Sequence, residues 1–368
     1  MINERFFTSL NTQAFAFYDH HGFVCLRGLI SSDVCEEIKA SWTVMVDRFT
    51  REIGVDQSQY LNVISQWRDL WKQSPFFYQL LTDYLAPFAA WGLGLNGVRL
   101  LHDHFIRKDG AGSNGLIPWH QDSMYWPVDR TGMSTWLAVD DAGIDQGCLQ
   151  VVAGSHRQAA ESPVDFMKSE RDFDASNATS VPVTCGDVVL LNSKTWHRSE
   201  PTSESHSRLA HLALWIPEQT CYRPEKASWH PLNHQVKVLA GELLNEDEFP
   251  VFGMRENRYG YSQENDHSGI DVRTGMFNAR ERIEHFVRGK SGGSGSLGQL
   301  LSDVGFREML AVEFAKANQI SADDCLSVIE RVWISASAYE RHGSRNVFNS
   351  AYAEWAQLTS IFDQRLSL

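Results

Sequence analysis

The sequence predicts a mainly β protein with helical additions, whose strands form a sandwich or jelly roll. Short runs rich in β-branched and aliphatic residues recur between residues 98 and 217, and polar turns containing glycine separate them. The regions on either side show the apolar spacing of helices instead. No Gly-x-Gly-x-x-Gly follows a strand, so a doubly wound, nucleotide-binding sheet is disfavoured.

The first hundred residues are expected to be mainly helical. Asp33 and Glu36 resemble a capping box, which predicts that a helix begins there and runs to about Phe49. Four elements are expected in this region, in the order helix, strand, helix, helix, over residues 12–20, 22–27, 33–49 and 75–91.

The central region is expected to form the β core, over about residues 98–217. Residues 157–180 show no sustained period and interrupt it, which predicts a long insertion that is either a functional lid or a surface loop. The expected strands cover residues 98–106, 134–139, 147–152, 187–191 and 208–216.

The C-terminal region predicts a separate helical extension. A Gly- and Ser-rich linker, residues 286–296, divides a first domain, residues 1–285, from this extension, residues 297–368. The linker resembles an engineered segment, and the sequence leaves open whether it is natural. Apolar stripes on the helices need a partner surface, either the β core or another subunit, so a homo-oligomer through these helices is one of two interpretations. The expected helices are residues 297–318, 321–342 and 349–365, and the stripes include Leu300, Val304, Met309, Val312 and Phe314.

Composition favours a soluble cytoplasmic protein with reduced thiols and does not identify a substrate. The 33 basic and 46 acidic residues give a net charge of −13, which disfavours nucleic acid and anionic membranes as partners. The N-terminus lacks a basic-then-apolar signal pattern, and no apolar run approaches the roughly 20 residues of a membrane span. None of the six cysteines forms a Cys-x-x-Cys pair, so neither a zinc knuckle nor a redox motif is expected.

The most informative motif is His120-x-Asp122. On extended backbone, residues two apart point to the same face, so this imidazole and carboxylate can share one metal ion. With His197 they make the two-histidine, one-carboxylate set that binds non-haem Fe(II). Alone, the pair is about as frequent as chance predicts, and the alternative is a solvated strand end. His102 and His104 form a rival pair on one strand face, without a third ligand in a matching context.

With these strands in place, the chain resembles the phytanoyl-CoA dioxygenase family of Fe(II)- and 2-oxoglutarate-dependent oxygenases. The resemblance extends from about residue 15 to residue 217. It is carried by WHQDS at residues 119–123, WLAVDDA at 136–142, GCLQVV at 147–152, GSH at 154–156, GDVV at 186–189, WH at 196–197, and Arg208.

The resemblance implies a double-stranded β-helix, which is a cupin-like jelly roll with the metal at its mouth. It implies that His120, Asp122 and His197 bind Fe(II) and leave positions for 2-oxoglutarate and O2. It places Arg208 on the distal carboxylate of 2-oxoglutarate, where a guanidinium offers a planar, charged partner. Trp136 is expected to line the same pocket. Related halogenases have Ala or Gly where this chain has Asp122, so the carboxylate argues for hydroxylation, or for desaturation or ring chemistry, and against halogenation.

Substrate recognition is the least determined part of the sequence. Ser123, Tyr125 and Trp126 lie next to the expected metal ligands. Arg107 or Lys108, at the end of the strand that enters the site, is expected to hold an anionic substrate, to assist 2-oxoglutarate, or to be only a solvated charge.

The expected activity is hydroxylation of a small-molecule C–H bond, with decarboxylation of 2-oxoglutarate to succinate and CO2. Specialised metabolism is one setting that suits such an enzyme. Two alternatives remain open at this point. One is desaturation, epoxidation or rearrangement with the same cofactors, and the other is a non-catalytic jelly roll that binds a ligand.

Overall fold

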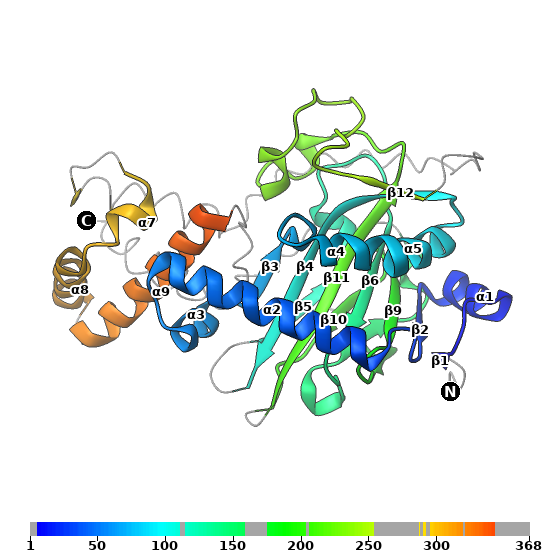
Figure 1. Ribbon diagram of the computed structural model, residues 1–368, viewed down its shortest axis with the longest axis horizontal. Helices are drawn as coiled ribbons and strands as arrows, with labels where there is room; N and C mark the ends of the chain where they lie inside the picture. The colour runs from blue at the N-terminus through cyan, green and yellow to red at the C-terminus, as the bar shows by residue number, and fades with distance from the viewer. Residues whose placement is uncertain are drawn as a thin grey trace. The chain divides into compact units, whose positions relative to one another are not determined.

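The chain divides into two compact units in the computed structural model (Figure 1). The first unit comprises Met1–Ser41 and Arg68–Val272, and the second comprises Trp42–Trp67 and Arg273–Leu368. The second unit thus includes an N-terminal segment that the boundaries expected at residues 285 and 297 leave out; those boundaries stay a prediction. The structure describes residues 6–110, 115–158, 175–203, 206–253, 287, 290–291, 295–318 and 321–342.

Two β-sheets form the first unit, as expected for a jelly roll. The larger sheet has the strand order β1-β2-β9-β6-β11-β4-β12, and β3, whose last residue belongs to this unit, pairs with β4. The smaller sheet has the order β5-β10-β7-β8. The larger sheet contains β1 (Phe6–Phe7), β2 (Phe23–Leu26), β3 (Gln66–Arg68), β4 (Gly97–Asp109), β6 (Met133–Ala138), β9 (Val188–Asn192), β11 (Ser207–Pro217) and β12 (Val251–Gly253). The smaller sheet contains β5 (Ile117–His120), β7 (Leu149–Val152), β8 (Ala178–Val181) and β10 (His197–Ser199).

The inner faces of the two sheets pack together and form the core. Alternate residues on each strand point inward, so a two-residue period selects the buried side chains. The larger sheet supplies Phe23, Trp136 and Val189 to this cluster, and the smaller sheet supplies Val151 and Val181. The predicted strands at residues 98–106, 134–139, 187–191 and 208–216 are all part of the larger sheet.

Helices cover the outer face of the larger sheet, as Figure 1 shows for α4 and α5. Phe77 of α4 contacts Phe105 of β4 and lies parallel to the ring of His211 of β11. The helices and short helical turns of this unit are α1 (Thr12–His21), α2 (Ser32–Ile53, which continues into the second unit), α4 (Pro75–Leu80), α5 (Ala86–Leu93), the π-helical turn Leu81–Leu85, and 3-10 turns at Leu70–Lys72, Asp122–Tyr125, Ile144–Gln146, Ser155–Arg157, Pro224–Lys226 and Pro231–His234.

Two sequence-based boundaries were wrong. Helix α2 begins at Ser32 because Ser31, not Asp33, accepts the first backbone N–H groups; its Oγ accepts from Val34 N at 3.4 Å. The helix continues to Ile53 and ends before Gly54, whose φ of 74° suits a glycine. The insertion expected at residues 157–180 contains strand β8 at its end, and residues 159–174 lie outside the described residues.

The second unit is helical where it is described. Helix α9 (Ala322–His342) packs against α3, α7 and α8. Only part of the expected stripe is buried: Phe314 is 2% exposed, whereas Val304, Met309 and Val312 are exposed. The remaining bounds are α3 (Gln57–Val63), α7 (Leu297–Leu300) and α8 (Val304–Asn318). The helix expected at residues 349–365 lies outside the described residues, and the homo-oligomer stays a prediction.

None of the described helices combines the length and the apolar character that crossing a membrane requires.

Gly132 allows β6 to approach β11 closely. A Cβ at this position would lie 1.8 Å from the backbone oxygen of Trp215. We expect Gly132→Ala to destabilise the protein by about 3 kcal/mol. The Cβ would overlap the backbone of Trp215, which cannot move aside as the end of a flexible side chain can. The measurement is the midpoint of urea unfolding. Gly94→Ala is the matched control: its Cβ meets nothing within 4 Å, and only the φ of 65° is unfavourable, at about 1 kcal/mol. Equal losses in both variants would contradict the close-approach argument.

Candidate metal centre

Three predicted ligands meet at the edge of the smaller sheet. His120 ends β5, His197 begins β10, and these two residues are direct partners in the antiparallel register. Asp122 follows two residues after His120, with extended backbone at Gln121 between them. Its Oδ1 lies 3.5 Å from His120 Nε2 and 3.6 Å from His197 Nε2. Among the described residues this is the one group of three or more candidate ligand atoms within 4.8 Å of one another.

The histidines are oriented as metal ligands are. His120 Nδ1 donates to the Pro118 carbonyl at 2.8 Å, and His197 Nδ1 donates to the Thr195 carbonyl at 2.9 Å. These bonds place the proton on Nδ1 and leave the lone pair of each Nε2 facing Asp122. Two imidazoles and one carboxylate suit Fe(II), so the residues present fit the metal that the sequence predicts.

The electrostatics of the site also favour a bound cation. Burial alone would raise the pKa of Asp122, but His197, His120 and a hydrogen bond from Ser134 lower it to about 2. Burial, reinforced by His120, lowers the pKa of His197 to about 4. At neutral pH, Asp122 is therefore a carboxylate and His197 is neutral, which are the forms that bind metal.

Arg208 lies on the same sheet face as the residues that contact the triad. In the register, Leu212 of β11 pairs with Trp136 of β6, and Leu214 pairs with Ser134. Because alternate residues share a face, Arg208, Trp136 and Ser134 all point inward. Ser134 donates to Asp122 there, which links this row of side chains to the triad.

One nitrogen of the Arg208 guanidinium has no hydrogen-bond partner among the described residues. Its Nε donates to the Gln146 carbonyl at 3.0 Å and its Nη2 to the Gly147 carbonyl at 2.6 Å, while Nη1 is buried without a partner. Its Cζ lies 5.2 Å from the centre of the Trp136 ring. Burial lowers the pKa of Arg208 to about 10, so the group is still cationic at neutral pH. A buried cation with an open donor suits an incoming carboxylate.

The residues expected to contact substrate are only partly brought together. The Tyr125 ring centre is 6.2 Å from that of His120, beside the triad. Ser123 turns away, with its Oγ donating to the Ser193 carbonyl at 3.1 Å, and Trp126 is buried. Arg107 is opposite Leu209 in the register, on the outer face of the sheet, and pairs with Asp109.

Sequence reasoning missed several polar residues around the triad. Ser134 was expected only as part of a strand, although its place two residues before Trp136 puts both on one face. Arg68, Trp229 and His230 lie far from the three ligands in the sequence, and no motif marked them. His102, whose ring is 6.4 Å from that of His230, was noted only as part of a rival metal-binding pair with His104.

A jelly roll that holds two histidines and one carboxylate at the edge of a sheet is typical of the non-haem Fe(II) oxygenases. The family model for phytanoyl-CoA dioxygenase (PhyH) matches residues 18–210, just over half of the 368 residues. The chain therefore belongs to the phytanoyl-CoA dioxygenase family, whose members use Fe(II), 2-oxoglutarate and O2. The predicted family, fold and cofactors are confirmed.

Curated relatives agree with this family. A phytanoyl-CoA dioxygenase domain-containing protein 1 homolog of Caenorhabditis briggsae is 25% identical over 50% of this chain and 69% of the relative. Phytanoyl-CoA dioxygenase domain-containing protein 1 of Rattus norvegicus is 31% identical over 32% of this chain and 45% of the relative. The peroxisomal phytanoyl-CoA dioxygenase of Mus musculus is 24% identical over 50% of this chain and 61% of the relative. The last two relatives are matched over less than two thirds of their length.

Solved structures share the fold. SnoK, a non-haem α-ketoglutarate-dependent carbocyclase from nogalamycin biosynthesis, superposes with a TM-score of 0.55 at 20% identity, over 66% of this chain and 96% of SnoK. The epimerase SnoN, solved with Fe3+, α-ketoglutarate and nogalamycin RO, superposes with a TM-score of 0.53 at 20% identity, over 65% of this chain and 97% of SnoN. At this identity the likeness establishes the architecture.

Proposed function

We propose that this protein is an Fe(II)/2-oxoglutarate-dependent dioxygenase that hydroxylates a C–H bond of a small molecule and forms succinate and CO2. The observation that carries the proposal is the convergence of His120, Asp122 and His197, with the open nitrogen of Arg208 on the sheet face that contacts them. Three ligands on one side of a metal leave room for a cosubstrate and O2.

Each residue has a defined part in this proposal. His120, Asp122 and His197 hold Fe(II), which when bound supplies the chemistry that couples O2 to decarboxylation of 2-oxoglutarate and oxidation of a C–H bond. The carbonyls of Pro118 and Thr195 fix the orientation of the two rings. The burial of His120 and His197 helps to exclude bulk water from the reacting atoms.

Arg208 holds the distal carboxylate of 2-oxoglutarate in the proposed complex. Its Nη1 is the open donor, and the carbonyls of Gln146 and Gly147 keep the guanidinium in place before the cosubstrate arrives. Trp136 flanks the guanidinium and limits how the carboxylate can approach.

Asp122 favours hydroxylation over halogenation, because its carboxylate takes the ligand position that a halide needs. Desaturation, epoxidation or rearrangement would use the same residues, and the mass and connectivity of the product distinguish them. A non-catalytic ligand-binding protein would have no need for an oriented triad together with an open, buried arginine.

The test has two steps. Fe(II) and 2-oxoglutarate are first added without oxygen, and we expect a visible charge-transfer band. Zn(II) in place of Fe(II) is the control and should give no band. Oxygen is then admitted and succinate is measured. Absence of both the band and succinate would exclude the proposed activity and favour the non-catalytic alternative.

A further inference from the structure

Arg68, the last residue of β3, is a buried cation without a described partner. Its side chain forms no hydrogen bond or ion pair within the described part of the chain, and both Nε and Nη1 are buried and unsatisfied. The residue is 8% exposed. Burial lowers the pKa of Arg68 to about 9, although Asp69 opposes this, so the guanidinium stays cationic at neutral pH.

The other buried cations of the described residues differ from Arg68 in this respect. Each donates to at least one backbone carbonyl, and these are Arg99, Lys108, Arg208 and Arg307. Taking a charge out of water is costly unless a partner compensates it. Arg68 therefore has the features of a group whose partner arrives from outside the chain.

Three buried histidines lie near Arg68. Its strand β3 pairs with β4, which contains His102 and His104, and the ring of His230 is 6.4 Å from that of His102. Burial, reinforced by Arg68, lowers the pKa of all three, so they are neutral at physiological pH. The Nδ1 atoms of His102 and His104 are buried without a hydrogen-bond partner. Neutral rings with unused nitrogens can donate to an anion without adding repulsion to Arg68.

The register places these histidines on the inner face of the larger sheet. His104 pairs with Leu212, which pairs with Trp136 on its other side. His102 pairs with Leu214, which pairs with Ser134. Since cross-strand partners share a face, His102 and His104 lie on the same face as Ser134, which donates to Asp122.

A chain of ring contacts also joins the cluster to the triad. His120 contacts the ring of Tyr125, and His102 contacts that of His104. The successive ring centres are 6.2 Å apart for His120 and Tyr125, 5.7 Å for Tyr125 and Trp229, 5.5 Å for Trp229 and His230, 6.4 Å for His230 and His102, and 5.1 Å for His102 and His104. An unbroken series of ring contacts thus connects the cluster with His120 of the triad.

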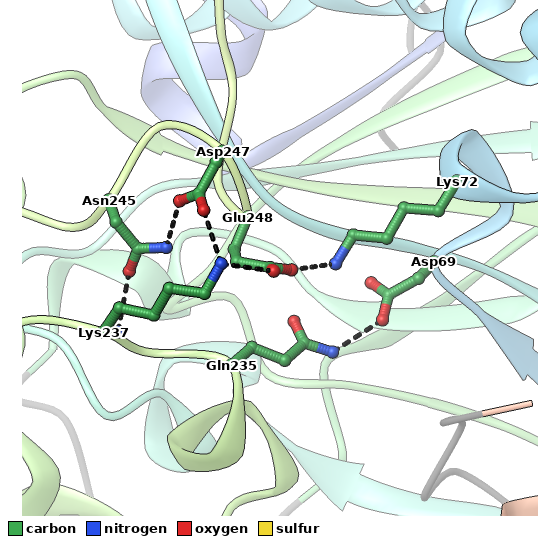
Figure 2. A network of polar contacts seen from close by, with 7 residues as sticks. All are labelled: Asp69, Lys72, Gln235, Lys237, Asn245, Asp247 and Glu248. Carbon is green, nitrogen blue, oxygen red and sulfur yellow. Dashed lines mark hydrogen bonds and ion pairs between the residues drawn. The ribbon is translucent and has the colours of Figure 1, made fainter.

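A polar network joins the segment that follows His230 to Asp69 and Lys72, which come after Arg68 in the sequence (Figure 2). Gln235 donates to Asp69 at 2.7 Å, and Lys72 pairs with Glu248. The Nζ of Lys237 lies 3.0 Å from Oε1 of Glu248, so Glu248 pairs with both Lys237 and Lys72. Asp69 has a φ of 57°, the one positive value at a non-glycine residue among those described, and such strain is common at ligand sites.

We propose that Arg68 binds an anionic oxygen group of the substrate, a carboxylate or a phosphate, with His102 and His104 as further donors. The substrate is then an organic acid or phosphate ester, whose C–H bond to be oxidised lies between this anchor and the triad. This inference rests on the proposed function, because it takes the neighbouring triad as the site of oxidation. It adds a second anion site to that of Arg208.

The experiment measures binding of small anions by the full-length protein. Acetate and inorganic phosphate are titrated, with 2-oxoglutarate and Zn(II) at saturation, and thermal unfolding is followed. We expect at least one anion to bind wild type about tenfold or more tightly than Arg68→Met, because a charge-assisted contact is lost. Arg68→Lys should retain part of the affinity. Arg130→Met, which removes a half-buried arginine bonded to the Gln219 carbonyl, is the matched control and should behave as wild type.

Further outcomes decide between the alternatives. Without anions, Arg68→Met should unfold at a higher temperature than wild type, since the uncompensated charge is gone. If it does not, and neither anion distinguishes the two proteins, the site does not exist. If Arg68→Met instead weakens 2-oxoglutarate binding as much as it weakens acetate or phosphate binding, Arg68 serves the cosubstrate and the substrate assignment is wrong. Wild type that binds these anions but never forms succinate would contradict the proposed activity alone. Preference for acetate or for phosphate identifies the acid group.

Discussion

Asp122→Ala should lower iron-dependent succinate formation by more than about 100-fold. Changes to groups that merely support a metal ligand typically cost 10–100-fold, so loss of a ligand should exceed that range. The variant removes the carboxylate that lies within 3.6 Å of both imidazoles, and leaves Ser134 without its acceptor. The measurements are titration of Fe(II) by the anaerobic absorption band and the rate of succinate formation.

Asp83→Ala is the matched control for Asp122→Ala. Asp83 lies in the π-helical turn, where its exposed carboxylate accepts from Gln79 at 3.1 Å. That variant should bind Fe(II) and form succinate as wild type does. Succinate formation at the wild-type rate in Asp122→Ala would show that the iron is held elsewhere.

Arg208→Met should weaken 2-oxoglutarate binding by about 100-fold. A hydrogen bond to a charged group contributes about 1.5–3 kcal/mol, and loss of the Nη1 contact at the upper end of this range corresponds to about two decades in Kd. Arg208→Lys keeps the positive charge but loses the planar guanidinium and its fixed donors, so its Kd should lie between those of wild type and Arg208→Met. The measurement is the concentration of 2-oxoglutarate that half-saturates the anaerobic band.

Fe(II) affinity without 2-oxoglutarate separates this effect from misfolding. Arg208 touches the carbonyls of Gln146 and Gly147 but none of the three proposed ligands, so Fe(II) should bind Arg208→Met as it binds wild type. An unchanged 2-oxoglutarate Kd would overturn the assignment of Arg208. A parallel loss of Fe(II) binding would indicate structural damage instead.

The predictable part of this site depends on local geometry and on long strands. His120 and Asp122 could be paired from sequence because extended backbone at Gln121 keeps residues two apart on one face. The long strands β4 and β11 were clear from their apolar runs. Their mutual register, which brings His104 and Arg208 onto one face, depends on non-local pairing that no local pattern encodes.

The short strands were harder to predict for a physical reason. β5, β8 and β10 contain three or four residues each, too few to establish a two-residue period, and they exist because their partners supply the hydrogen bonds. The direct pairing of His197 with His120 could therefore not be derived from a local pattern. Arg68 was missed because no local sequence pattern predicts that an arginine is buried. Its role depends on residues that only the folded chain brings close to it.

The direct pairing of His120 with His197 has a consequence for folding. A slip of one residue between β5 and β10 would turn one imidazole to the opposite side of the sheet and abolish the ligand set. Only the native alignment of these two short strands can bind the ion, so binding free energy is available to that alignment alone. A cation present during refolding would then stabilise the native pairing over its shifted alternatives. The ion would thus help to set the strand register as well as serve as a cofactor.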